Sequence, residues 1–216
     1  MNKALEKKLV NIAEEKYPTG DPSHDLQHAL RVLNLAKKIA KSVNADLDII
    51  VPAALFHDVI VYPKNSPKSK HEATESSILA GEILNKQKDY PKKKIDKVKT
   101  CILQCSFSKG IIPELIEAKV LQDADRLEAT GAISIMRTFS SGGQMKQPFY
   151  FPEDPFHKKT EPVKFNSGIA LFYRRLLVVE SGMHTSLAKK IAKRRTKFLK
   201  DFLKELRLEL KESDIM

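Results

Sequence analysis

Apolar side chains recur at three- and four-residue intervals along most of the chain, which is the spacing of amphipathic helices. No alternating apolar and polar pattern reaches the length of a useful strand. The sequence therefore predicts an all-α protein, a single-domain helical bundle over residues 1–216. The expected helices are Ala4–Lys16, Ser23–Val43, one that holds His57, His71–Lys86, Pro91–Ser106, Pro113–Leu121, Val163–Ser181 and His184–Leu210.

Three stretches interrupt this helical pattern. Pro18, Gly20 and Pro22 end the first helix, and Ser23 is a good N-cap for the second. The prolines of Val61–Ser69 favour an extended loop. The segment Gly142–Pro162 has no period and is long and aromatic, which favours a structured lid or a homodimer contact.

The most apolar run, Ile49–Tyr62, contains the polar pair His57–Asp58. Asp46 or Asp48 can cap a helix here, and Pro52 is tolerated only in or near its first turn. Burying an imidazole and a carboxylate without partners is costly, so a metal ion is the natural compensation. His28 lies on the apolar stripe of the preceding helix, although a lone histidine there would more simply be a core residue.

Four segments carry a family pattern: HDLQHALRV at residues 24–32, LFHD at 55–58, SSILA at 76–80 and QDADRLEATGAISIMR at 122–137. From about Asp21 to Glu209 the chain resembles the HD-domain metal-dependent phosphohydrolase superfamily. The resembling branch is small, single-domain, bacterial and archaeal, and includes nucleotide pyrophosphohydrolases. The resemblance implies a buried metal site, a core of about 21–140, and C-terminal helices of about 163–210 packed on it.

The same resemblance implies one divalent ion held by His28, His57, Asp58 and Asp125. Two imidazoles and two carboxylates suit Mn²⁺ or Mg²⁺ in function, with Fe²⁺, Co²⁺, Ni²⁺ and Zn²⁺ as alternatives. Metal-bound water would attack phosphorus, because the chain has no recognised nucleophile motif or glycine-rich phosphate loop. His24, Asp25 or Asp123 would move the proton, and the sequence leaves open which. Asp123 could instead orient a ligand histidine.

Cations follow the ligand pair directly. The residues Lys64, Lys68, Lys70 and His71 are candidates to bind substrate phosphates, against the alternative of a lysine-rich surface loop. The two cysteines, Cys101 and Cys105, face the same side of a helix and are best interpreted as reduced core residues. Where the resembling branch often has His-Ser-Phe-Ser, this chain has Cys105 as the first residue, which removes a possible pocket histidine.

Composition refines this picture. The 216 residues carry a formal net charge of +11, and much of the excess lies in the C-terminal helix. Those cations oppose an apolar face, which favours a solvated helix surface over attraction to a polyanion. The apolar runs are too short to span a bilayer and the N-terminus lacks a signal-peptide core, so we expect a cytoplasmic protein.

The expected function is hydrolysis of a phosphorylated small molecule, with nucleoside triphosphate pyrophosphohydrolysis as the leading hypothesis. One alternative is a nucleic-acid or polyphosphate binding protein with a structural metal, favoured by the net charge. Another is a phosphodiesterase acting on a nucleotide messenger, for which the paired tandem motif of some such enzymes is absent.

Overall fold

The computed structural model describes residues 1–17, 24–63, 66–106, 110–157 and 167–215, and the regular elements within these ranges are all helical. The all-α prediction is therefore confirmed. The chain divides into two compact units, Met1–Asp125 (unit 1) and Arg126–Met216 (unit 2). The single-domain organisation of residues 1–216 stays a prediction. None of the described helices combines the length and apolarity needed to cross a bilayer.

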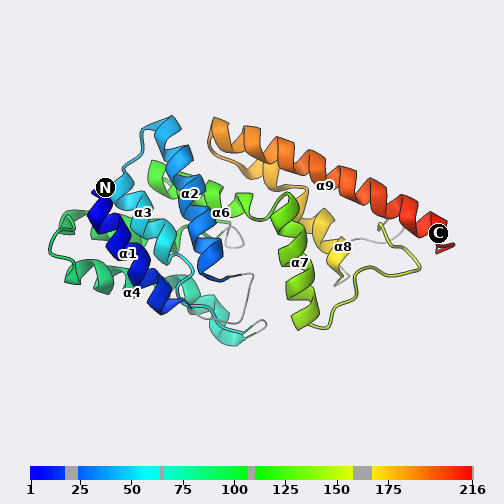
Figure 1. The fold of residues 1–216 in the computed structure, drawn as a ribbon, viewed down its shortest axis with the longest axis horizontal. Helices are drawn as coiled ribbons and strands as arrows, with labels where there is room; N and C mark the ends of the chain where they lie inside the picture. The colour runs from blue at the N-terminus through cyan, green and yellow to red at the C-terminus, as the bar shows by residue number, and fades with distance from the viewer. Residues whose placement is uncertain (18–23, 64–65, 107–109, 158–166, 216) are drawn as a thin grey trace. The chain divides into compact units, whose positions relative to one another are not determined.

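Unit 1 is built around one short helix, α3, which contacts four of its neighbours, α1, α2, α4 and α5 (Figure 1). Its helical elements are α1 (Lys3–Lys16), α2 (Leu26–Val43), α3 (Leu47–Phe56), η1 (Pro67–His71), α4 (Glu72–Lys86), η2 (Lys92–Lys94), α5 (Ile95–Leu103) and α6 (Ile116–Leu127), whose last two residues belong to unit 2. Every residue of Ile49–Phe56 is buried. These eight residues are all apolar and leave the helix no solvent face after its first turn, so α3 becomes the centre of the core.

Pro52 shows how α3 tolerates a proline in its interior. Asp46 caps the helix by accepting a hydrogen bond from the Asp48 amide at 2.9 Å. Pro52 is the sixth residue of α3, beyond the predicted first turn, and it cannot donate to the Asp48 carbonyl four residues earlier. The Tyr90 hydroxyl donates to that carbonyl instead, at 2.8 Å. A side chain distant in sequence thus replaces the missing helical bond.

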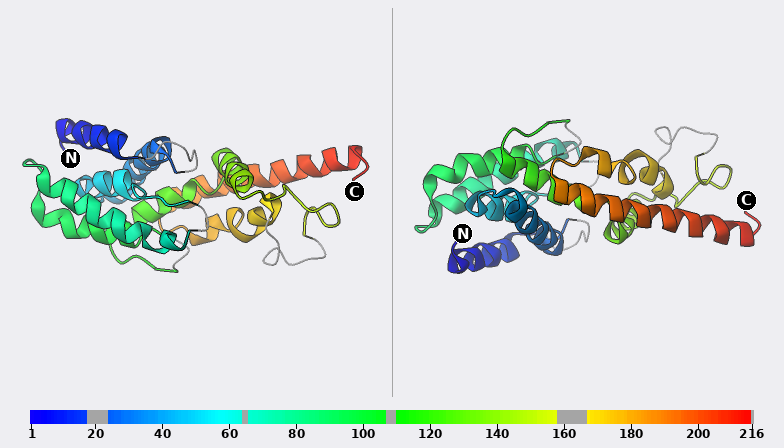
Figure 2. Two further views of the ribbon diagram at one scale, coloured as in Figure 1. Left: turned by 90° about the horizontal axis from the view of Figure 1, so that it is seen from below. Right: turned by 90° about the horizontal axis from the view of Figure 1, so that it is seen from above.

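Unit 2 consists of α7 (Ala132–Gln144), α8 (Gly168–Leu171), the π-helical turn η5 (Phe172–Leu176), the 3-10 turn η6 (Val179–Gly182) and α9 (Ser186–Glu212). Figure 2 shows α9 as the long rod of this unit. Its apolar face supplies Leu199, Leu203 and Leu210 to a core shared with Phe156 and Phe172. The remaining face is charged, as the sequence predicts for the C-terminal helix.

Several predicted boundaries are wrong for local reasons. The second helix begins at Leu26, because Asp25 caps it; Ser23 lies outside the described residues. The prolines of the loop after α3 do not keep it fully extended, since Ser66 caps the turn η1. The segment expected at Pro113–Leu121 begins at Ile116 and continues to Leu127. The predicted Pro91–Ser106 helix is regular only at Ile95–Leu103, after the 3-10 turn η2.

The C-terminal half of the chain departs from prediction in two places. In place of one helix over Val163–Ser181, the described part is broken into α8, η5 and η6. The Gly182 carbonyl accepts from the Arg126 guanidinium, which fixes the end of η6. The aperiodic stretch predicted from Gly142 begins only after Gln144, and its residues 158–162 lie outside the described ranges. Its role as a lid or dimer contact stays a prediction.

We predict that Tyr90→Phe lowers the free energy of unfolding by about 1–3 kcal/mol, because the partly buried Asp48 carbonyl loses its donor. Urea unfolding measures the effect. In a Pro52→Ala background the alanine N–H can donate to the same carbonyl, so the cost of Tyr90→Phe should shrink. An equal cost in both backgrounds would contradict this account of Pro52.

Candidate metal centre

His28 enters the site from the first turn of α2. The side chain of Asp25 accepts a hydrogen bond from the His28 amide at 2.8 Å, which is the N-cap bond of that helix. His28 lies on the buried stripe with Val32, Ala36 and Ile39, and its side chain is fully buried. The cap and the apolar stripe together direct the imidazole into unit 1.

His57 is placed by the end of α3, where it is the C-cap residue. The last carbonyls of a helix have no intrahelical donor. The His57 ring provides a donor for one of these carbonyls, since its Nδ1 lies 2.9 Å from the Ala54 carbonyl oxygen. A carbonyl can only accept, so Nδ1 carries the proton and Nε2 is left as the potential ligand atom. This is the arrangement that metal-binding histidines usually have.

Asp125 comes from α6, the helix that also carries Asp123. The Asp125 carboxylate is half-buried, and its Oδ1 lies 3.4 Å from His28 Nε2 and 3.8 Å from His57 Nε2. On the other side, the Cys105 thiol lies 3.9 Å from Asp125 Oδ2. Asp125 thus faces both imidazoles through one oxygen and a thiol through the other.

The donor atoms of His28, His57 and Asp125 all lie within 4.8 Å of one another. The fourth predicted ligand, Asp58, lies beside this group, with its Oδ2 3.7 Å from Nε2 of each histidine, but it is not one of the three residues that converge; its ligand role stays a prediction. Metal donors at about 2.1 Å from one ion are separated by roughly 3–3.5 Å, close to the spacings seen here. His57 Nε2 is buried and has no hydrogen-bond partner among the described residues. A divalent ion would satisfy that atom, so the donor set fits a metal.

The electrostatics of the metal-free cluster point the same way. Burial lowers the pKa of His57, but the Asp58 and Asp125 carboxylates outweigh it and raise the pKa to about 9. Burial raises the pKa of each carboxyl, yet the histidines more than offset it, so the Asp58 pKa is lowered and the Asp125 pKa lies well below its usual range. At neutral pH the His57 ring is therefore charged and carries a second proton on Nε2, which an incoming metal would displace.

The predicted proton-transfer residues occupy different surroundings. The His24 ring is half-buried, with its centroid 5.8 Å from that of His28, so it borders the cluster. Asp25 uses one carboxylate oxygen for the N-cap bond of α2. Asp123 is fully buried on α6 and is not in the donor group found among the described residues. Their catalytic roles stay predictions.

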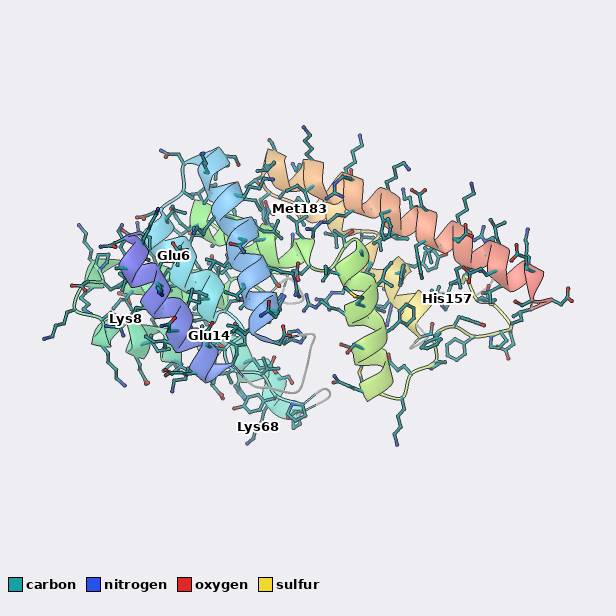
Figure 3. All side chains as sticks on the ribbon, viewed as in Figure 1. Glu6, Lys8, Glu14, Lys68, His157 and Met183 are labelled. Carbon is teal, nitrogen blue, oxygen red and sulfur yellow. The ribbon has the colours of Figure 1, made fainter. Side chains whose placement is uncertain are left out.

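The predicted substrate-binding cations lie on η1, except for Lys64, which is outside the described residues. Lys68, Lys70 and His71 are all exposed, and Figure 3 shows Lys68 at the outside of unit 1. The loop beneath them is held by Tyr62, whose amide donates to Glu72 at 2.8 Å and whose hydroxyl donates to Glu75 at 2.5 Å. The Lys68 ammonium lies 5.8 Å from the Tyr62 ring centroid. These cations are therefore exposed side chains that follow a loop held by Tyr62.

Sequence reasoning missed two contacts of the cluster. The Ala54 carbonyl orients His57 from one helical turn away, and Cys105 sits against Asp125. The signal for Cys105 was its position, since the resembling branch often has a histidine there. The sequence predicted a buried core residue, and Cys105 is only 5% exposed, but its thiol also borders the site.

Comparison with known proteins agrees with this geometry. The family model described as HD domain matches residues 25–130, which contain all four predicted ligands. YpgQ of Bacillus subtilis (strain 168) is 32% identical over 193 residues, covering 87% of this chain and 84% of that protein. The Lin1889 protein from Listeria innocua has a similar crystal structure, with a TM-score of 0.72, 32% identity and 98% coverage of both chains.

Two further crystal structures resemble the chain over nearly its whole length. One is Bacillus subtilis YpgQ in complex with ADP, with a TM-score of 0.71, 27% identity and coverage of 95% of this chain and 97% of that one. The other is an HD-superfamily hydrolase from Bacillus thuringiensis, with a TM-score of 0.71, 26% identity and coverage of 97% and 98%.

We predict that Asp125→Ala weakens Mn²⁺ binding at least about tenfold, because the ion loses a charged ligand. Elemental analysis of the purified protein and a titration with Mn²⁺ measure the change. Asp123→Ala is the matched control on the same helix and should keep the metal stoichiometry. Full metal content in Asp125→Ala with loss in Asp123→Ala would show that the two aspartates have been assigned the wrong way round.

Proposed function

The chain belongs to the HD-domain superfamily of hydrolases, and from this we propose that it is a metal-dependent phosphohydrolase acting on a nucleotide. The reaction we favour is pyrophosphohydrolysis of a nucleoside triphosphate, in which water attacks phosphorus and pyrophosphate leaves. The observation that carries the proposal is the convergence of His28, His57 and Asp125, with the buried Nε2 of His57 left for a metal.

The donor set supports one divalent ion, and we propose Mn²⁺ or Mg²⁺, with Fe²⁺, Co²⁺, Ni²⁺ and Zn²⁺ as alternatives. His28, His57, Asp58 and Asp125 would hold it. When bound, such an ion lowers the pKa of a coordinated water and polarises a phosphoryl oxygen. Two carboxylates nearly neutralise its charge, so the surrounding side chains must contribute the rest of the attraction for a polyanionic substrate.

The chain's own residues divide the remaining work. The Ala54 carbonyl holds the His57 ring in one tautomer, and the N-cap bond of Asp25 sets the first turn of α2 beneath His28. His24 borders the cluster and is half-buried, so its imidazole can exchange protons with solvent. We propose His24 as the leading candidate to move a proton, with Asp25 and Asp123 as alternatives.

Two observations support a nucleotide as the substrate: a ligand bound by a relative, and the cations that follow the loop after Asp58. YpgQ has been crystallised with ADP, and a nucleotide is the ligand we propose for this chain. Lys68, Lys70 and His71 lie on the 3-10 turn that follows the loop after Asp58, and Tyr62 anchors that loop to α4. Long cationic side chains on an anchored loop can reach the phosphates of a substrate held next to Asp58.

A second candidate function is polyanion binding by unit 2. A cavity of about 530 Å³ opens between the start of α7 and α9, and its lining includes Arg194, Arg195 and Lys197. Part of this charge is already engaged, since Arg195 donates to the Leu127 carbonyl and Lys197 pairs with Asp201 at 2.9 Å. That makes nucleic acid or polyphosphate the weaker hypothesis. Hydrolysis of a nucleotide messenger is a variant of the first function.

Metal-supplemented hydrolysis assays test the proposed function. We expect nucleoside triphosphates to yield pyrophosphate with Mn²⁺ or Mg²⁺, no product in chelator, and a loss of more than about 100-fold in kcat/KM in Asp58→Ala. Asp89→Ala, which removes an exposed carboxylate of unit 1, is the control and should retain activity. Product release that persists in chelator, or in Asp58→Ala, would refute the metal mechanism.

We also predict that Lys70→Ala raises KM for a nucleoside triphosphate several-fold without loss of bound metal, because a cation near the phosphates is removed. The effect should shrink as salt is raised, since exposed charges are screened. Steady-state kinetics at low and high salt measure it. Arg194→Ala, in the cavity of unit 2, should leave KM unchanged; a KM effect confined to Arg194→Ala would assign the substrate to that cavity instead.

A further inference from the structure

Tyr17 is a buried aromatic residue at the edge of the metal centre. It is the C-cap of α1, where its amide donates to the Ala13 carbonyl at 3.0 Å, and the residue is only 6% exposed. Helix α1 packs against α3, the helix that ends at His57. The ring is therefore carried into unit 1 next to the ligand pair His57–Asp58.

The Tyr17 hydroxyl oxygen faces the Asp58 backbone amide, but its O–H has no acceptor among the residues that the structure describes. Two other tyrosines of unit 1 are satisfied, since Tyr90 donates to the Asp48 carbonyl at 2.8 Å and Tyr62 donates to Glu75 at 2.5 Å. A buried hydroxyl without a partner destabilises a fold, and such groups in native proteins often mark a missing ligand. Tyr17 is therefore the exception that requires an explanation.

The surroundings of the hydroxyl identify what it can bond. It faces the backbone of Asp58 and lies in the field of the Asp58 and Asp125 carboxylates, with Cys105 nearby. A phenol has an ordinary pKa of about 10, so at neutral pH it is a hydrogen-bond donor, and the strongest acceptors around it are the two carboxylates.

The Asp58 carboxylate can accept such a hydrogen bond. Its Oδ2 lies 3.7 Å from Nε2 of both His28 and His57, and within the described ranges no hydroxyl or amide donor bonds its carboxylate. A carboxylate that ligates a metal through one oxygen is usually held by a hydrogen bond at the other. An unused donor and an under-bonded ligand thus lie next to each other.

We propose that Tyr17 is a positioning residue of the metal centre, whose hydroxyl donates a hydrogen bond to the Asp58 carboxylate when a divalent ion is bound. The bond would fix the carboxylate with one oxygen toward the two imidazoles and satisfy the buried hydroxyl at the same time. The inference rests on the metal centre of the proposed function. It does not require that the substrate be a nucleotide.

A positioning role and a merely structural role predict different results for Tyr17→Phe. This change removes only the hydroxyl and keeps the ring that fills the core. If the hydroxyl donates to the Asp58 carboxylate only when the metal is bound, Tyr17→Phe should melt without metal at an unchanged or higher temperature than wild type. The reason is that the change removes a buried O–H that has no acceptor. Mn²⁺ binding should weaken about tenfold, and the rise in Tm on adding Mn²⁺ should be smaller.

The experiment compares Mn²⁺ titrations and Tm, with and without Mn²⁺, for wild type, Tyr17→Phe and Tyr90→Phe. Tyr90→Phe is the matched control: it should melt lower in both states and bind Mn²⁺ as wild type does, because its hydroxyl serves Asp48. A double-mutant cycle with Asp58→Asn then tests the partner, since Tyr17→Phe should add little loss of affinity in that background.

Each outcome decides a different point. Equal Mn²⁺ affinity in Tyr17→Phe and wild type overturns the role of Tyr17, as does a lower Tm without metal or an additive loss in the double mutant. If wild type binds no Mn²⁺, the inference and the metal centre fail together. If wild type binds Mn²⁺ but hydrolyses no phosphate compound, only the proposed function fails, and weaker binding by Tyr17→Phe still supports the inference.

Discussion

The constraint on which unit 1 depends is the placement of two buried imidazoles and two half-buried carboxylates around the end of a helix whose last eight residues are all apolar. The residues of α3 from Ile49 to Phe56 are all buried, and the chain places His57 and Asp58 immediately after them. Groups of this kind are stable in a core only when each one is compensated. Within the cluster the charges compensate one another in part, and the Nε2 atom of His57 still has no hydrogen-bond partner in the described part of the chain.

Helix ends do much of the positioning. His28 lies in the first turn of α2, His57 is the cap of α3 and Asp125 is close to the end of α6. Backbone groups that have no intrahelical partner at such ends become the supports of the site, as the Ala54 carbonyl does for His57 and the His28 amide does for the Asp25 cap. Stability of the helix ends and geometry of the site are therefore two results of the same hydrogen bonds.

Two tyrosines near the site have hydrogen-bonded hydroxyls, whereas two buried polar atoms at the site do not. Tyr62 and Tyr90 use their hydroxyls to hold the loop after Asp58 and the start of α3. Tyr17 and His57 each bury a polar atom for which the described residues provide no partner. Since folding normally satisfies such atoms, their coincidence at one cluster is the strongest physical argument that a ligand belongs there.

The sequence by itself determined the helical class, the extents of α1 and α4 to within one residue, and the C-terminal helix to within two. It also named His28, His57 and Asp125, which the structure brings together. These follow from local period and from a family pattern. It could not show that Asp25 serves as a cap, that Tyr90 replaces the bond lost at Pro52, that Cys105 lies against Asp125, or that Tyr17 faces Asp58. Each of these except the cap joins residues separated by 20 or more positions. Only the packed tertiary structure decides them, because helical spacing fixes which face of a helix is buried but not which distant side chain that face will meet.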